Sequence, residues 1–306
     1  MKSKHKYFKY VNKNKYKIIN CNTCGYWHVF PMPTENEIAK YYETEYYETI
    51  DDVPTVKDKL DDPDSFYHLQ YEDRLRQITR LLPSDLPKTV LDIGAGYGDF
   101  LAFMKNNGWK VQGIEPSIKA YQNIKDKTLN IKLASINDLP KELNPSSVIT
   151  LNNVLEHLRE PHKILEIIKK YLLLDRGILL IIVPNDFNIL QYILMNTLIK
   201  NMPEKHNYWI SPPAHLNYWS HRTMKKYIKK NGFNILYLTT EFPMEIFPFI
   251  GYNYIAHPEV GKKAHLKRVK FEKFLKKANL SKFKDLFYES FAKIGIGRDT
   301  HIYVTK

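Results

Sequence analysis

The stretch TVLDIGAGYGDFL, residues 89–101, decides the fold that the sequence predicts. Its apolar start, 89–93, is typical of a strand buried on both faces of a sheet. Three of the chain's 12 glycines, Gly94, Gly96 and Gly98, follow within five residues, and an amphipathic segment comes next. Glycine at a sharp strand-to-helix turn lets the backbone approach a ligand closely. We therefore predict a ligand-binding turn here; the alternative is an ordinary connection between a strand and a helix.

The same kind of apolar run recurs along the chain, separated by amphipathic segments that predict helices. The predicted strands after the first are 110–115, 130–135, 147–152, 177–183 and 234–240. Strands alternating with helices are typical of an α/β fold with a doubly wound, mostly parallel sheet. We predict four regions: an N-terminal CxxC segment with cap helices, a core, a basic helical insertion and a final strand of the core, at 1–84, 85–245, 246–290 and 291–306.

The ligand at the glycine turn follows from the spacing and the charges. The pattern is GxGxG rather than the GxGxxG of dinucleotide sites, and the carboxylate of Asp99 would repel a pyrophosphate. Asp92 adds negative charge, which favours a ligand with a cationic amino group and a sulfonium. Glu115 ends the second strand, where a carboxylate can accept hydrogen bonds from both ribose hydroxyls. These features favour S-adenosylmethionine over NAD.

Several stretches resemble class I S-adenosylmethionine-dependent methyltransferases. LDIGAGYGDFL (91–101) resembles their motif I, and GIEPS (113–117) their acidic second-strand motif. SVITLNNVLEHLREPHKIL (147–165) and PPAHLNYWSHRTMKKYIKKNGF (212–233) resemble the subset with a Leu-Glu-His sequence, and CNTCGYWHVFPMPTENEIAKYYETEYY (21–47) is similar to half of the zinc-binding region of sugar C-methyltransferases. The resemblance implies a Rossmann-like methyltransferase fold with a seven-stranded sheet, a methyl donor S-adenosylmethionine and a product S-adenosylhomocysteine.

The resemblance also implies which residues hold the cofactor. It places them after the first, second, third and fourth strands: Asp92, Gly94, Ala95, Gly96, Gly98, Glu115, Pro116, Asn137, Asn152 and Asn153. Many relatives have an acid near the adenine where this chain has Ser135. Asn137, Asp138 or the backbone would then contact the exocyclic amine.

Catalytic candidates lie in the two motifs of that subset. Methyl transfer needs alignment and, for a hydroxyl or a carbon acid, removal of a proton. His157 could accept that proton with Glu156 orienting it, because imidazole titrates near neutral pH. His215 is a second candidate. The alternatives are that Glu156 and His157 begin a helix and pack on the sheet, and that His215 bonds to backbone.

The two cysteines, Cys21 and Cys24, suit a metal or redox pair in a reducing compartment. The resembling region normally has a first CxxC upstream, which this chain lacks, so a zinc site would need His28, His5 or water. We therefore expect no bound metal, and we interpret the two cysteines as the remnant of a zinc knuckle that no longer binds metal.

The distribution of charge along the chain indicates which kinds of partner to expect. The net charge is +13, but residues 1–20 hold seven Lys and no acid, and residues 261–306 hold thirteen Lys and Arg against four acids. Residues 21–260, with 26 basic and 29 acidic residues, are slightly acidic. Basic ends steer or tether more often than they define chemistry, and we expect no nucleic-acid partner. We find no membrane span or secretory signal in the sequence, and we expect a cytoplasmic protein.

The leading hypothesis is C- or O-methylation of a sugar, a sugar nucleotide or a surface-polysaccharide precursor. An alternative is O-methylation of a quinone precursor or other lipophilic acceptor, with the basic segment 262–277 in weak contact with an anionic membrane. Less favoured alternatives are an RNA methyltransferase and an inert cofactor-binding subunit. The sequence does not indicate an oligomeric state.

Overall fold

The structure is a computed structural model that describes residues 5–41, 65–136, 139 and 143–306. The chain divides into two compact units. The first unit comprises the described residues up to Phe66 together with 184–227 and 239–300, and the second comprises 67–183, 228–238 and 301–306.

The second unit is built on a seven-stranded sheet with the strand order β10-β11-β8-β7-β4-β5-β6. Five neighbouring strands pair in parallel. The strand β4 (Thr89–Ile93) pairs with β5 (Lys110–Glu115) and with β7 (Ser146–Asn152). In turn, β5 pairs with β6 (Ile131–Leu133), and β7 pairs with β8 (Leu173–Pro184). The remaining strands are β10 (Asn234–Thr240) and β11 (Asp299–Thr305). The predicted seven-stranded, mostly parallel sheet is confirmed, and each predicted strand is present.

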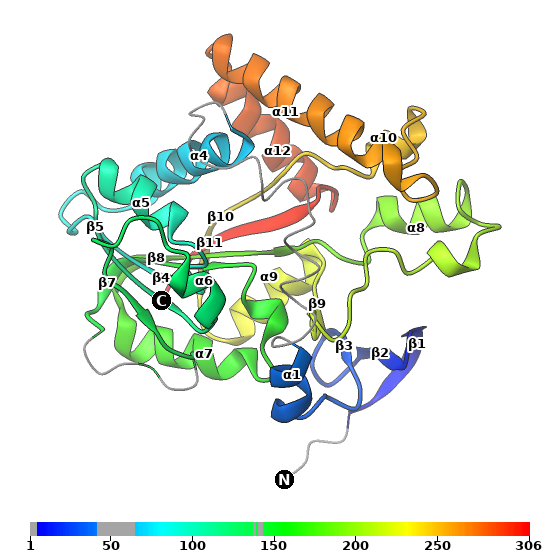
Figure 1. The fold of residues 1–306 in the computed structure, drawn as a ribbon, viewed down its shortest axis with the longest axis horizontal. Coiled ribbons are helices and arrows are strands. Elements are labelled where there is room, and N and C mark those ends of the chain that lie inside the picture. The colour runs from blue at the N-terminus through cyan, green and yellow to red at the C-terminus, as the bar shows by residue number, and fades with distance from the viewer. Residues whose placement is uncertain (1–4, 42–64, 137–138, 140–142) are drawn as a thin grey trace. The chain divides into compact units, whose positions relative to one another are not determined.

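Helices cover both faces of this sheet. Helices α4 (Phe66–Leu81) and α5 (Asp99–Asn106) lie on one side and α7 (Pro161–Ile167) on the other (Figure 1). The short helix α6 (Ile118–Gln122) is capped by Ser117, whose hydroxyl accepts a hydrogen bond from the Ala120 N–H. Because both faces are covered, strands β4, β7 and β8 are almost wholly buried, which explains their unbroken apolar runs.

The first unit contains an antiparallel four-stranded sheet with the order β1-β2-β3-β9. Its strands are β1 (Tyr7–Lys13), β2 (Tyr16–Cys21), β3 (Tyr26–Val29) and β9 (Asn217–Tyr218). The expectation of a helical N-terminal segment is therefore wrong for residues 7–29. Ile18, Ile19 and Cys21 on β2 are buried, while β1 is an exposed edge strand, where lysines discourage pairing with other chains.

This unit also contains helices, and residues 42–64 of the predicted cap-helix region lie outside the described residues. A capping box forms at Thr34: the Thr34 N–H donates to Glu37 Oε2 at 2.7 Å, and the Glu37 N–H donates to Thr34 Oγ1 at 3.2 Å. It opens α1 (Glu35–Tyr41). The helical insertion is also present; it and the segment after β8 supply helices α8 (Ile189–Asn196), α10 (Ile246–Phe249), α11 (Gly261–Lys277) and α12 (Ser281–Lys293). Helix α9 (His221–Lys230) begins in the first unit and ends in the second.

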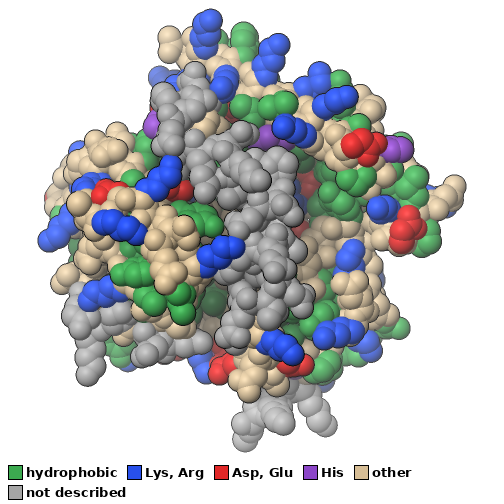
Figure 2. All heavy atoms as spheres, viewed as in Figure 1, with side chains coloured by type: hydrophobic (Ala, Val, Ile, Leu, Met, Phe, Trp, Pro, Cys, Tyr) green, Lys and Arg blue, Asp and Glu red, His purple; other side chains and the backbone are tan. Residues whose placement is uncertain are grey.

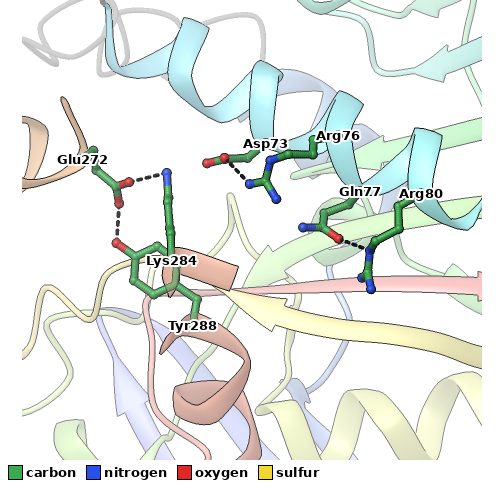
Figure 3. Close-up of polar contacts among 7 residues, drawn as sticks. All are labelled: Asp73, Arg76, Gln77, Arg80, Glu272, Lys284 and Tyr288. Carbon is green, nitrogen blue, oxygen red and sulfur yellow. Dashed lines mark hydrogen bonds and ion pairs between the residues drawn. The ribbon is translucent and has the colours of Figure 1, made fainter. Parts of the chain in front are cut away.

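Helices α11 and α12 share a buried ionic network. Lys284 forms an ion pair with Glu272, and the Tyr288 hydroxyl donates a hydrogen bond to the same carboxylate (Figure 3). Glu272 is 1% exposed. Burial raises the pKa of Tyr288, so the phenol remains the donor. This network explains how a Lys-rich helix packs without an apolar residue at every inward position.

We expect Glu272→Ala to lower the free energy of unfolding by about 3–5 kcal/mol, because it leaves the Lys284 ammonium buried without its counter-ion. Urea denaturation measures the loss. The control is Lys293→Ala, which removes the exposed Lys293–Glu289 pair and should cost less than about 1 kcal/mol. Equal, small losses in the two variants would show that the Glu272 network does not stabilise the unit.

Candidate active site

The glycine turn lies where the order of the sheet reverses. β4 pairs with β5 on one side and with β7 on the other, and Ile93 stands opposite both Ile114 and Leu151. The carboxyl ends of three strands therefore lie together in the second unit. Ligands of doubly wound sheets bind at such a reversal, where two neighbouring loops diverge.

The three glycines of the turn have left-handed backbone conformations, with φ of +80° at Gly94, +55° at Gly96 and +78° at Gly98. A Cβ atom on Gly94 would lie 2.6 Å from Val154 Cγ2, and one on Gly98 would lie 2.8 Å from Ile131 Cδ1. Packing therefore explains those two glycines. At Gly96, no described atom lies within 4 Å of such a Cβ. The turn is thus open at Gly96, where a ligand could lie against the backbone.

Glu115 is fixed beside this opening by the backbone. Its Oε2 accepts the Gly96 N–H at 2.7 Å, and its Oε1 accepts the Ser117 N–H at 2.8 Å. Burial raises the pKa of Glu115, while the two N–H donors lower it. Each carboxylate oxygen has a second lone pair, so both can still accept a hydroxyl hydrogen. The orientation fits a ligand with two adjacent hydroxyl groups.

Asp92 is a buried carboxyl group near the end of β4. Burial raises its pKa from 3.8 to about 7, and the charge of Glu115 adds to this shift. Two groups oppose it: the Thr150 hydroxyl, which donates a hydrogen bond to Oδ1, and the positive charge of Arg74. Neither Thr150 nor Arg74 was predicted from the sequence. Thr150 is the polar residue at the centre of the apolar run VITL, the one local signal available for it.

The loop after β7 carries the other predicted residues of this unit. Asn152 ends the strand with its Oδ1 buried and without a hydrogen-bond partner among the described residues, and Asn153 is exposed with a φ of +52°. Residues Leu155–His157 form a single 3₁₀ turn rather than the start of a longer helix. Glu156 is buried, and its Oε1 lies 3.8 Å from His157 Nε2, which is within ion-pair range and longer than a hydrogen bond.

The remaining predicted residues are Ala95, Pro116 and His215, together with Asn137 and Asp138. Ala95 is buried in the glycine turn, where its N–H donates to the Ile114 carbonyl at 2.9 Å, and Pro116 is exposed directly after Glu115. Asn137 and Asp138 lie outside the described residues. His215 belongs to the first unit, where its N–H donates to the Ser211 carbonyl and its carbonyl accepts the Tyr218 hydroxyl at 2.8 Å.

Comparison with known proteins identifies the family. A family model described as a methyltransferase domain matches residues 66–238, more than half of the chain. The chain belongs to this methyltransferase family. The match spans the glycine turn, Glu115 and the loop after β7. The prediction of a methyltransferase that uses S-adenosylmethionine is thereby confirmed, and the finer resemblance to sugar C-methyltransferases stays a prediction. No curated protein matches the chain.

Solved structures of methyltransferases are similar to this chain. The plantazolicin methyltransferase BpumL, in complex with S-adenosylhomocysteine, is 13% identical with a TM-score of 0.52, over 88% of this methyltransferase and 93% of that chain. An S-adenosylmethionine-dependent methyltransferase from Archaeoglobus fulgidus is 17% identical with a TM-score of 0.47, over 78% and 94% of the two chains. A possible sarcosine dimethylglycine methyltransferase from Galdieria sulphuraria is 17% identical with a TM-score of 0.47, over 79% and 86%. At 13% identity the likeness to the plantazolicin methyltransferase concerns the fold alone.

Proposed function

We propose that this methyltransferase binds S-adenosylmethionine at the carboxyl ends of β4, β5 and β7 and transfers the methyl group to a sugar, a sugar nucleotide or a related polysaccharide precursor. The observation that carries the cofactor site is the Glu115 carboxylate, held by the N–H groups of Gly96 and Ser117 beside the opening at Gly96. Glu115 would accept the two ribose hydroxyls. Asp92 would face the cationic amino group, and Asn152 would offer its buried Oδ1.

The residues of the loop after β7 would then act on the acceptor. The sulfonium supplies a methyl group with a good leaving group, so the protein has to align the acceptor and remove its proton. His157 is the proposed base for that proton. Glu156, 3.8 Å from the imidazole, would stabilise its protonated form. We keep Pro116, Asn137 and Asn153 as proposed cofactor contacts and His215 as a second proposed catalytic residue.

The binding of S-adenosylmethionine should strengthen as the pH rises through 7. A cationic amino group next to Asp92 favours the ionised carboxylate, whose pKa is about 7 in the free protein. Below that pH a proton must leave before binding, so we expect the dissociation constant to fall by up to about tenfold per pH unit between pH 5.5 and 7 and to level off above it. Calorimetry at several pH values measures this trend.

Asp92→Asn is the matched control, because its amide oxygen can still accept from Thr150. It should bind more weakly and lose most of the pH dependence. The raised pKa also means that the native state holds a proton which the unfolded state has lost between pH 3.8 and about 7. Asp92 therefore makes the free energy of unfolding fall as the pH rises through that window, and Asp92→Asn should raise the melting temperature at pH 8. A pH-independent affinity in the unmodified chain would remove Asp92 from the site.

Buried polar groups of the first unit support a hydroxyl-rich acceptor. Asp186 follows the end of β8 by two residues, and Glu245 is fully buried. Glu245 Oε1 accepts the Gln191 amide at 3.1 Å, whereas Asp186 Oδ1, Glu245 Oε2 and Arg298 Nη1 are buried without hydrogen-bond partners among the described residues. Burial lowers the pKa of Arg298, but the charges of nearby carboxylates, including Glu245 and Asp186, outweigh burial and raise it. These groups therefore interact electrostatically, but their atoms without hydrogen bonds still cost free energy unless a ligand or water pairs with them. Sugar hydroxyl groups can pair with all three, whereas an apolar ring cannot.

A lipophilic acceptor is the second candidate, favoured by one surface. Lys and Arg side chains gather over α11 and α12 (Figure 2). Exposed apolar side chains lie on the same two helices, among them Leu266, Phe274, Phe283 and Leu286. Lysines with exposed apolar groups are typical of helices that bind anionic membrane surfaces. No helix in the described part of the chain is long and apolar enough to span a membrane.

Transfer of a labelled methyl group to candidate acceptors tests the proposal. The full chain is incubated with labelled S-adenosylmethionine and with sugar nucleotides, quinone precursors or RNA, and Gly96→Arg sets the background. Transfer to a sugar nucleotide supports the proposal. Transfer only to quinone precursors, together with co-sedimentation with anionic vesicles, would favour the second candidate, and transfer only to RNA would contradict both.

A further inference from the structure

Four potential metal-binding side chains meet in the first unit. His5 precedes β1, Cys21 ends β2, Cys24 lies in the following turn, and His28 lies on β3. One ligand atom from each lies within 4.8 Å of the other three. The two cysteines are not joined in a disulfide. Two thiols and two imidazoles form one of the common ligand sets of structural zinc sites.

The distances between these atoms match the edges of a zinc tetrahedron. His5 Nδ1 lies 3.4 Å from Cys21 Sγ and 3.6 Å from Cys24 Sγ. With zinc–sulfur bonds of about 2.3 Å and zinc–nitrogen bonds of about 2.05 Å at tetrahedral angles, the sulfur–nitrogen distance is about 3.6 Å. The separations thus need little adjustment for one ion to contact all three atoms.

His28 is oriented as a metal ligand. Its Nδ1 lies 2.8 Å from the Val29 carbonyl oxygen, and because a carbonyl only accepts, Nδ1 carries the proton. The Nε2 atom therefore holds a lone pair, and it is buried without a hydrogen-bond partner among the described residues. His28 is 2% exposed. Metal-binding histidines are commonly held in this way, with the second ring nitrogen donating to a backbone carbonyl.

The turn between the cysteines is shaped to present both sulfur atoms. The Cys24 N–H donates to Cys21 Sγ at 3.4 Å, and the Gly25 N–H donates to the Cys21 carbonyl at 2.8 Å. Gly25 has a φ of +84°, a conformation that favours glycine. A hydrogen bond from a backbone N–H stabilises a thiolate, which is the form that binds metal.

We propose that His5, Cys21, Cys24 and His28 bind one zinc ion. All four ligands come from the protein, so the site is structural, and no coordination position remains for a substrate. The ion would tie the residue before β1 to the β2–β3 hairpin, and the two thiol protons would pass to solvent on binding. This revises the expectation of a metal-free knuckle. His5 is 16 residues from Cys21 in sequence, and only the pairing of β1 with β2 shows that the two are neighbours.

Metal analysis and cobalt substitution test the site without reference to activity. The full chain, purified under reducing conditions and supplied with zinc, should retain one zinc ion per chain after dialysis. Cobalt in its place should give the visible bands of a tetrahedral site and a thiolate charge-transfer band. His28→Ala should weaken zinc binding at least about tenfold, and His5→Ala should have a similar effect. His28→Cys should retain one ion, because it restores a fourth donor, and should strengthen the charge-transfer band.

The control is His257→Ala, which removes an exposed histidine of the same unit. It should bind zinc as the unmodified chain does. Absence of bound zinc and of a tetrahedral cobalt spectrum in the unmodified chain would overturn the proposal. Unchanged affinity in both His5→Ala and His28→Ala would overturn the assignment of the histidines. Because the readout is metal content, failure here would leave the proposed methyl transfer unaffected.

Discussion

Gly96→Arg is expected to fold and to lose S-adenosylmethionine binding, with a dissociation constant raised at least about 100-fold, or about 2.7 kcal/mol. The reason is the open space at Gly96: a Cβ atom built there meets no described atom within 4 Å, so a side chain that extends from it would occupy the volume proposed for the cofactor. The left-handed φ of +55° adds strain of about 1–2 kcal/mol, which the fold should survive. Equilibrium dialysis measures binding, and thermal unfolding measures the fold.

Gly94→Ala is the matched variant, because its Cβ would lie 2.6 Å from Val154 Cγ2. We expect it to lower the melting temperature markedly, by strain and overpacking. Gly96→Ala, which adds only one methyl group in open space, should bind the cofactor more tightly than Gly96→Arg. If Gly96→Arg bound S-adenosylmethionine as the unmodified chain does, the cofactor could not lie against this turn.

His157→Ala is expected to slow methyl transfer by about 100-fold or more while changing cofactor affinity by less than a few-fold. A general base acts on the acceptor's proton, so its loss should lower kcat at saturating cofactor. Single-turnover transfer of labelled methyl group gives this rate. His162→Ala is the control, since it removes an exposed histidine from the following helix.

A variant of Glu156 gives a second test of the role of His157. If Glu156 stabilises the protonated imidazole, Glu156→Gln should lower the apparent pKa in the pH–rate profile, because the neutral amide favours the uncharged ring. A His157→Ala protein with an unchanged rate would leave His157 a packing role, as the alternative interpretation holds.

The parts of the fold that follow from local pattern were predictable. Strands such as 89–93 and 147–152 are apolar without alternation because helices cover both faces, and the glycine turn and Glu115 stand at fixed places after strands. The N-terminal sheet was not predicted because the first 20 residues of the chain are rich in lysine. Some of these lysines lie on the exposed edge strand β1, whereas the buried Ile18 and Ile19 lie on the neighbouring strand β2.

Contacts between distant segments could not be predicted in the same way. The charge of Arg74, on a helix that precedes the sheet, opposes the rise in the pKa of Asp92 that burial causes. The Thr150 hydroxyl donates a hydrogen bond to Asp92 from the paired strand, 58 residues away in sequence. The sequence offered His5 and His28 as possible partners of the cysteines, and only the strand register brings them together. At the cofactor site and at the zinc site, the contacts that could not be predicted are therefore those between segments that lie far apart in the sequence.

The most direct test is a crystal structure of the chain with S-adenosylhomocysteine. We predict density for the ligand in the opening at Gly96, with both ribose hydroxyls on the Glu115 carboxylate and the amino group next to Asp92. The hydrogen bonds from Gly96 and Ser117 to Glu115 should remain. Ligand density elsewhere on the chain, or a ribose that does not contact Glu115, would contradict the proposed cofactor site.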